Sequence, residues 1–304
     1  MKKLINLLIF VLVLSCGTEK RPGSEKINVI TTIFPLKDIT KNIGGDKVAV
    51  TNLLPSGSSP HTFEPTPGQI KELQRSDVCI RIGLDIDFWL DKMITSAGKK
   101  DLKIVTASEH VSIITEEEEE HEPGEEEHSD HEHKGGNPHI WLDPVIVKEI
   151  AKQITSALTE KLPAEKDYFE KNLSEYNRKL DELDLEIRDR VSGFSLKEFI
   201  SMHSAWIYFA QRYGLKQAGV LTESPGKEPT PRYVADLIRT IKSINAKTVF
   251  AEFQLNPKLA ETIAGETGTN VLLLDPLGDE LSEERNTYIK LMKYNLKIME
   301  EGLK

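Results

Sequence analysis

Four of the eight histidines in this chain lie in one short acidic stretch. Residues 116–134 read EEEEEHEPGEEEHSDHEHK, with eleven carboxylates and the histidines His121, His128, His131 and His133. Neutral imidazole is a borderline-soft ligand that suits zinc, copper or nickel, so the stretch is predicted to bind metal. It has hardly any apolar side chain to offset the entropy of ordering, so we expect a disordered loop over 116–136. The alternative is a solvated acidic linker.

Three other histidines and one aspartate follow predicted strands. His61 lies in the loop after the strand 48–54, His139 in the segment 137–144, His203 at the end of the strand 199–202, and Asp275 at the end of the strand 271–274. In open α/β sheets ligands bind beyond the carboxyl ends of the strands, where loops are free to carry polar groups. Three imidazoles and one carboxylate complete a tetrahedral Zn²⁺ site. Taken singly, each residue is equally compatible with an ordinary loop or cap position.

Other reactive residue types have simpler interpretations. His110 has no such context and is expected on the surface, and Cys79 lies in the predicted strand 78–82 as a buried, inert thiol. Glu64, three residues after His61, offers a general base for a zinc hydrolase, which needs an open metal position. Asp275 would close that position, and no HExxH helix occurs.

Strands and helices alternate through the chain, which predicts parallel sheets covered by helices. Strands are expected at 27–32, 48–54, 78–82 and 102–105, and again at 199–202, 217–221, 248–252 and 270–274. The fold class is therefore α/β, with two lobes that each hold a parallel β-sheet flanked by helices. The N-terminal lobe is expected at 27–163 and the C-terminal lobe at 192–304.

One long helix is expected to join the lobes over 164–191. Apolar residues recur there at steps of three and four, between charged residues, which predicts an amphipathic helix with a single apolar stripe. At 1.5 Å per residue it would be roughly 42 Å long, enough to cross a domain as a rigid connection. A coiled-coil dimer is the weaker alternative, because the e and g positions show no charge pattern.

The N-terminus has the pattern of an export signal. Lys2 and Lys3 precede an apolar run over 4–14, and about 11 residues are too few to span a bilayer, which needs about 20. The sequence Ser15-Cys16-Gly17 resembles the lipobox of bacterial lipoproteins. That resemblance implies a signal peptide at 1–15, a lipidated Cys16 and a tether at 16–26. A plain secretory signal with an incidental cysteine is the alternative.

The net charge of −10 comes from one place. Residues 116–134 contribute 1 − 11 = −10, which leaves 38 basic and 38 acidic residues elsewhere. No basic face is apparent, which argues against nucleic acid as a partner.

Four motifs resemble a known family. PHTFEP at 60–65, NPHIWLDP at 137–144, MHSAW at 202–206 and DPLG at 275–278 are similar to the metal-binding, long-helix class of ABC-transporter substrate-binding lipoproteins. The similarity covers essentially the whole mature chain in order. One departure is Asp87, where a glutamate would be expected.

The resemblance implies capture of a metal ion between two lobes and delivery to an ABC permease. The implied ligands are His61, His139, His203 and Asp275, and the implied protein is no enzyme. A His-rich acidic loop marks the zinc members, and its histidines would form an accessory site. Manganese or iron is the alternative cargo, and an adhesin is a further possibility. We expect a monomer in the cell envelope, lipid-anchored outside the cytoplasm on the periplasmic side or the cell surface.

Overall fold

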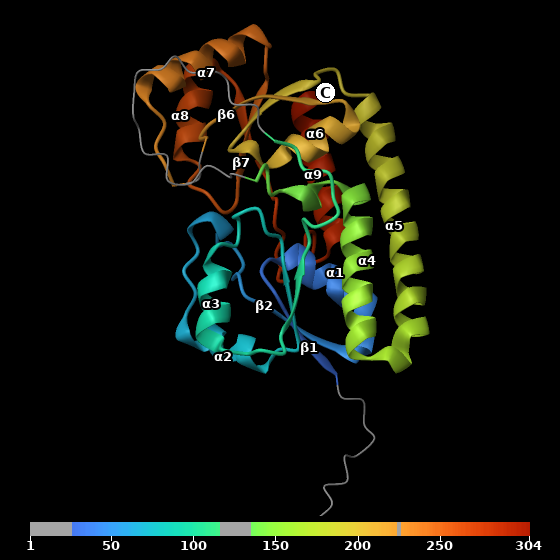
Figure 1. Cartoon of the computed structure of the whole chain (residues 1–304). Helices are drawn as coiled ribbons and strands as arrows, with labels where there is room; N and C mark the ends of the chain where they lie inside the picture. Colours follow the sequence, from blue (N-terminus) through green and yellow to red (C-terminus); the bar gives the residue numbers. More distant parts are fainter. Residues whose placement is uncertain (1–25, 116–134, 224–225) are drawn as a thin grey trace, which may run out of the picture.

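The computed structural model describes residues 26–115, 135–223 and 226–304, which form two lobes (Figure 1). Each lobe contains a four-stranded parallel sheet. The first has the order β2-β1-β3-β4 and the second β6-β5-β7-β8, so the second lobe repeats the topology of the first. The strands are β1 (Ile27–Thr31), β2 (Val48–Asn52), β3 (Val78–Arg81), β4 (Lys103–Thr106), β5 (Glu198–Ser201), β6 (Lys216–Val220), β7 (Thr248–Glu252) and β8 (Asn270–Leu274).

The central strands are buried on both faces, as parallel strands covered by helices must be. β3 reads VCIR and β7 reads TVFAE, and all five residues of β7 are buried. Such strands are therefore rich in β-branched and aromatic residues. Glu252, the last residue of β7, is the exception, since it is a charged residue in a buried strand. A carboxylate is costly to bury without a partner.

Helices cover both sheets. In the first lobe they are α1 (Phe34–Gly44), α2 (Pro67–Arg75), α3 (Trp89–Ala97) and α4 (Pro144–Lys161), and in the second α6 (Ile207–Tyr213), α7 (Pro231–Ser243), α8 (Lys258–Thr267) and α9 (Tyr288–Leu303). Several begin at a proline that follows an extended residue, where the missing N–H costs nothing. α4 is also capped, because the Asp143 carboxylate accepts a hydrogen bond from Val145 N.

The predicted long helix is confirmed as α5 (Lys166–Ser192), 27 residues or about 40 Å long. It begins two residues later than expected, because Pro163–Glu165 forms a separate 3-10 turn. α5 lies along one side of both lobes (Figure 1), against α4 and α1 in the first lobe and α9 and α6 in the second. Its buried stripe faces the core of this chain, so the stripe needs no coiled-coil partner. The stripe consists of Phe169, Tyr176, Leu180, Leu183, Ile187 and Val191.

The sequence pattern predicts helices over 86–97 and 284–302, and both begin later in the structure. The helix expected from residue 86 starts at Trp89, because the Asp87 carboxylate accepts hydrogen bonds from Ile82 N and Gly83 N and fixes a turn there. The helix expected from 284 starts at Tyr288, because residues 279–287 fold back and Asp279 N donates to Arg285 O. In both places a local hydrogen bond competes with the helix.

Some predictions lie outside the described residues. These are the signal peptide at 1–15, the lipidation of Cys16, the tether up to residue 25, and the accessory histidines His121, His128, His131 and His133. Within the described ranges, none of the helices combines the length and the apolar character needed to cross a bilayer.

Candidate metal centre

Three histidines from distant segments meet between the lobes. His61 lies in the short 3-10 helix Pro60–Thr62, His139 directly precedes the 3-10 helix Ile140–Leu142, and His203 follows β5. Their candidate ligand nitrogens all lie within 4.8 Å of one another. The three histidines that were predicted to lie beyond strand ends are therefore close together in the structure.

The spacing of the imidazoles suits a small metal ion. The Nε2 atoms of His139 and His203 are 3.1 Å apart, whereas nitrogens of a tetrahedral site with Zn–N bonds of about 2.05 Å are separated by about 3.3 Å. Both histidines are buried, and the cavity they line measures about 10 Å³. A space of that size holds about one water molecule or one ion.

Asn137 fixes the orientation of His139. Its Oδ1 accepts a hydrogen bond from His139 N at 3.0 Å and lies 3.0 Å from His139 Nδ1. If Nδ1 carries the proton in this contact, Nε2 keeps the lone pair that a metal needs. The amide Nδ2 donates to Ser204 O at 2.7 Å, so one side chain ties the segments of two histidines together.

Glu252 makes the corresponding contact with His203. Its Oε1 lies 2.9 Å from His203 Nδ1, and both side chains are buried, although neither atom has a well-aligned hydrogen bond. Sequence reasoning missed this residue. The signal was present, because Glu252 ends a buried strand in the same way as the residues that were singled out.

Asp275 is not part of the three-histidine cluster. Its carboxylate is fully buried, and Oδ1 accepts hydrogen bonds from Leu277 N at 3.0 Å, Gly278 N at 2.9 Å and Gln254 Nε2 at 2.8 Å. Oδ2 is paired with Arg285. The next two residues, Pro276 and Leu277, nevertheless line the histidine cavity, so Asp275 lies directly behind its wall.

Hydrogen bonds between the lobes hold the segments of His139 and Asp275 together. Trp141 Nε1 donates to Pro276 O at 2.6 Å, and Tyr288 OH donates to Trp141 O at 2.8 Å. Burial holds the pKa of Tyr288 well above its ordinary value, so its hydroxyl stays a donor. Tyr288 N also donates to Asp38 Oδ2 in α1. The two lobes are therefore joined by buried contacts as well as by α5.

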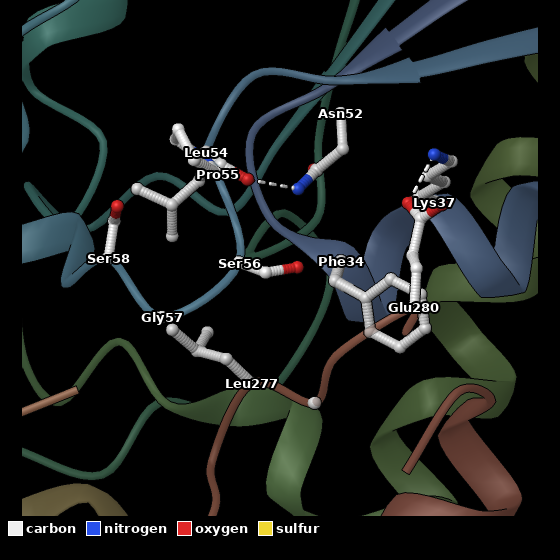
Figure 2. A pocket seen from close by; sticks show the side chains of 11 residues that line it. Phe34, Lys37, Asn52, Leu54, Pro55, Ser56, Gly57, Ser58, Leu277 and Glu280 are labelled. Atoms are coloured by element: carbon white, nitrogen blue, oxygen red, sulfur yellow. Dashed lines mark hydrogen bonds and ion pairs between the residues drawn. The ribbon is translucent and has the colours of Figure 1, made fainter. Parts of the chain in front are cut away.

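The structure also has a larger cavity of about 160 Å³, whose lining residues are drawn in Figure 2. It contains no imidazole, and its lining includes the ion pair between Lys37 and Glu280. Leu277 lines both cavities. The three imidazoles thus line only the smaller of these two cavities, and the larger one leaves space behind the segment that follows Asp275.

The remaining candidates lie elsewhere. His110 and Glu64 are exposed and neither belongs to the cavity lining. Cys79 is buried, and burial raises the pKa of its thiol to about 12, so it is held as an unreactive thiol. Asn137 N donates to Ile114 O at 2.8 Å, which brings together the two chain segments that flank residues 116–134, next to His139.

Comparison with known proteins identifies close similarities. Residues 29–302 match the family model described as ZnuA, zinc-uptake complex component A periplasmic. The chain is 36% identical over 302 residues to the high-affinity zinc uptake system protein ZnuA of Bacillus subtilis, covering 97% of this chain and 94% of that protein. It is 29% identical over 319 residues to the manganese ABC transporter substrate-binding lipoprotein PsaA of Streptococcus anginosus, covering 100% and 99%. A solved structure titled "Crystal structure of ZnuA" superposes with a TM-score of 0.80 at 30% identity, covering 91% of this chain and 99% of that one.

Proposed function

This chain belongs to the ZnuA family of zinc-uptake components, and from that premise we propose that it captures Zn²⁺ outside the cytoplasm and delivers it to an ABC importer. Members of the family are metal-binding substrate-binding proteins that work with a permease and an ATPase, and they are not enzymes. The zinc hydrolase alternative is therefore wrong. Glu64, the general base considered for it, is exposed and does not line the histidine cavity.

The observation that carries the proposal is the convergence of His61, His139 and His203 on one small cavity. We propose that these three imidazoles bind the metal. We propose Asp275 as the fourth ligand, reached by exchanging its contact with Arg285 for the metal. The buried links between the lobes support capture by local rearrangement of loops in preference to a wide hinge motion.

Zinc is favoured over manganese by the chemistry of the donors. Three neutral nitrogens suit Zn²⁺, whereas the harder Mn²⁺ prefers carboxylate and water oxygens. Manganese stays the second candidate because the similarity to a manganese-binding relative extends over the whole chain.

The anchor and the accessory loop complete the proposal. Relatives in this family are named lipoproteins, which supports lipidation of Cys16 and a place on the outer side of a membrane. We propose that the protein acts as a monomer, with lobes at 27–163 and 192–304. The histidines of 116–134 would collect metal weakly beside the tight site.

A chelator-competition titration tests this function. The purified wild-type protein should bind one tight equivalent of zinc, and His139→Ala should weaken that site by at least about a hundredfold, since one of three imidazole bonds is lost. His110→Ala is the matched control, because His110 is outside the cluster, and it should bind as the wild type does. Unchanged tight binding by His139→Ala would contradict the assignment.

A further inference from the structure

We propose that Arg285 sets the metal preference of this protein, by competing with the bound metal for the carboxylate of Asp275. This inference rests on the proposed function, because it assumes that the histidine cluster binds a divalent ion. Arg285 is not among the residues that line the histidine cavity. Its guanidinium places a positive charge beside a proposed ligand of a cation.

The contacts of Asp275 leave little freedom for a metal. Three N–H groups occupy Oδ1, and Arg285 Nη1 occupies Oδ2. Asn295 fixes the backbone of the same residue, because its Oδ1 accepts from Asp275 N and its Nδ2 donates to Asp275 O. The carboxylate is therefore held by Arg285 on the one oxygen that the neighbouring N–H groups leave open.

Arg285 itself is firmly positioned. Its guanidinium carbon lies 4.0 Å from the ring centroid of Phe253 and 5.4 Å from that of Tyr294, and its side chain is 14% exposed. Cation–π contacts of this kind favour a planar guanidinium and keep it from swinging into solvent. The ion pair thus joins a fully buried carboxylate to a partly buried guanidinium that aromatic rings hold in place.

A cation beside a ligand carboxylate weakens that ligand. A carboxylate behind a ligand, such as Glu252 next to His203, raises the basicity of the imidazole. A guanidinium next to Asp275 lowers the ligand strength of that carboxylate and also repels the incoming ion. The cost differs between metals. Zinc obtains most of its binding from three imidazoles, whereas manganese depends on carboxylate oxygens. Arg285 therefore penalises manganese more than zinc.

The segment after Asp275 has room to adjust. Leu277 and Glu280 line the larger cavity drawn in Figure 2, and Glu280 is paired there with Lys37. A small shift of 276–280 into this space would let Asp275 turn toward the imidazoles without moving the lobes. The carboxylate can thus be reached once its pairing with Arg285 is broken.

The test compares zinc and manganese affinities of Arg285→Gln with those of the wild type, by competition titration with each metal alone. We expect manganese affinity to rise by about tenfold, the usual size of an outer contact to a metal ligand. Zinc affinity should change by less than about threefold, because the imidazoles are untouched. In the double variant Arg285→Gln/Asp275→Asn the gain for manganese should disappear, since no carboxylate is left to release.

Lys216→Gln is the matched control, because it removes the ion pair with Glu198 in the same lobe, away from both cavities and from segment 276–280. It should leave the ratio of the two affinities unchanged. An equal shift in Lys216→Gln, or unchanged or weaker manganese binding in Arg285→Gln, would overturn the proposal.

A replacement variant and the zinc affinity of the wild type distinguish the possible outcomes. If circular dichroism shows that Arg285→Gln is unfolded, Arg285→Lys replaces it. Arg285→Lys keeps the charge but loses the planar fork, and a smaller shift in the same direction is expected. No tight zinc binding by the wild type would reject the proposed function, whereas tight zinc with an unchanged affinity ratio in the variants would reject only the role of Arg285.

Discussion

Glu252 Oε1 lies 2.9 Å from His203 Nδ1, at the end of β7 and against the cavity that the three imidazoles share. A carboxylate in this position holds the imidazole in one orientation and makes its other nitrogen a stronger ligand. Asn137 has the equivalent place beside His139. Two of the three histidines are therefore oriented by a buried polar side chain.

Glu252→Gln should weaken zinc binding by about 10- to 100-fold, because the charge that supports His203 is lost while the shape is kept. Zinc competition titration measures the loss. Glu198→Gln is a matched control, because Glu198 starts a strand of the same lobe and is paired with Lys216 away from the cavity. Equal zinc affinity in both variants would show that Glu252 has no positioning role.

Deletion of residues 116–134 should leave one tight zinc site and remove only weaker ones. The flanking segments are already joined by the hydrogen bond from Asn137 N to Ile114 O, so a short connection can replace the deleted residues without moving His139. Zinc stoichiometry at increasing chelator strength separates the two classes of site. Loss of the tight equivalent on deletion would place it in that stretch.

Leu180→Ala should destabilise the protein by about 2–5 kcal/mol, since it opens a cavity under the fully buried face of α5. Leu185 on the same helix is 64% exposed, and Leu185→Ala should change the free energy of unfolding by less than about 0.5 kcal/mol. Urea unfolding of both variants gives the comparison. Similar losses of unfolding free energy in the two variants would mean that the buried stripe of α5 does not pack against the lobes.

Tyr288→Phe should cost about 1–3 kcal/mol of stability, because it leaves the buried Trp141 O without its donor. It should also loosen the connection between the segments of His139 and Asp275. The half-buried Tyr168, whose hydroxyl makes no such bond to the other lobe, provides the control Tyr168→Phe. Thermal unfolding measures the stability of both variants. An equal loss of stability in Tyr288→Phe and Tyr168→Phe would contradict this role for Tyr288.

The fold could be predicted from the sequence because its signals are local. Alternation of strand and helix patterns gave the two sheets, and the period of apolar residues gave α5 to within two residues. The errors fall where a local hydrogen bond stops a helix. The side chain of Asp87 delays α3, and the backbone hydrogen bond from Asp279 N to Arg285 O closes a turn that delays α9.

The candidate site was predictable only in part. The clustering of His61, His139 and His203 could be predicted, because strand ends in parallel sheets converge. Arg285 and Glu252 were not found, because their roles depend on which side chains lie opposite them in the folded chain. Sequence reasoning also could not show that the carboxylate of Asp275 is paired with Arg285 and lies outside the histidine cluster.

X-ray absorption spectroscopy of the zinc-loaded protein shows directly whether the three imidazoles bind the metal. The sample is the variant without residues 116–134, loaded with one equivalent of zinc, so that only the tight site contributes. We expect three imidazole ligands with Zn–N distances of about 2.0–2.1 Å, and two imidazoles in the same sample carrying His203→Ala. A spectrum without imidazole scattering, or one that His203→Ala leaves unchanged, would contradict this expectation.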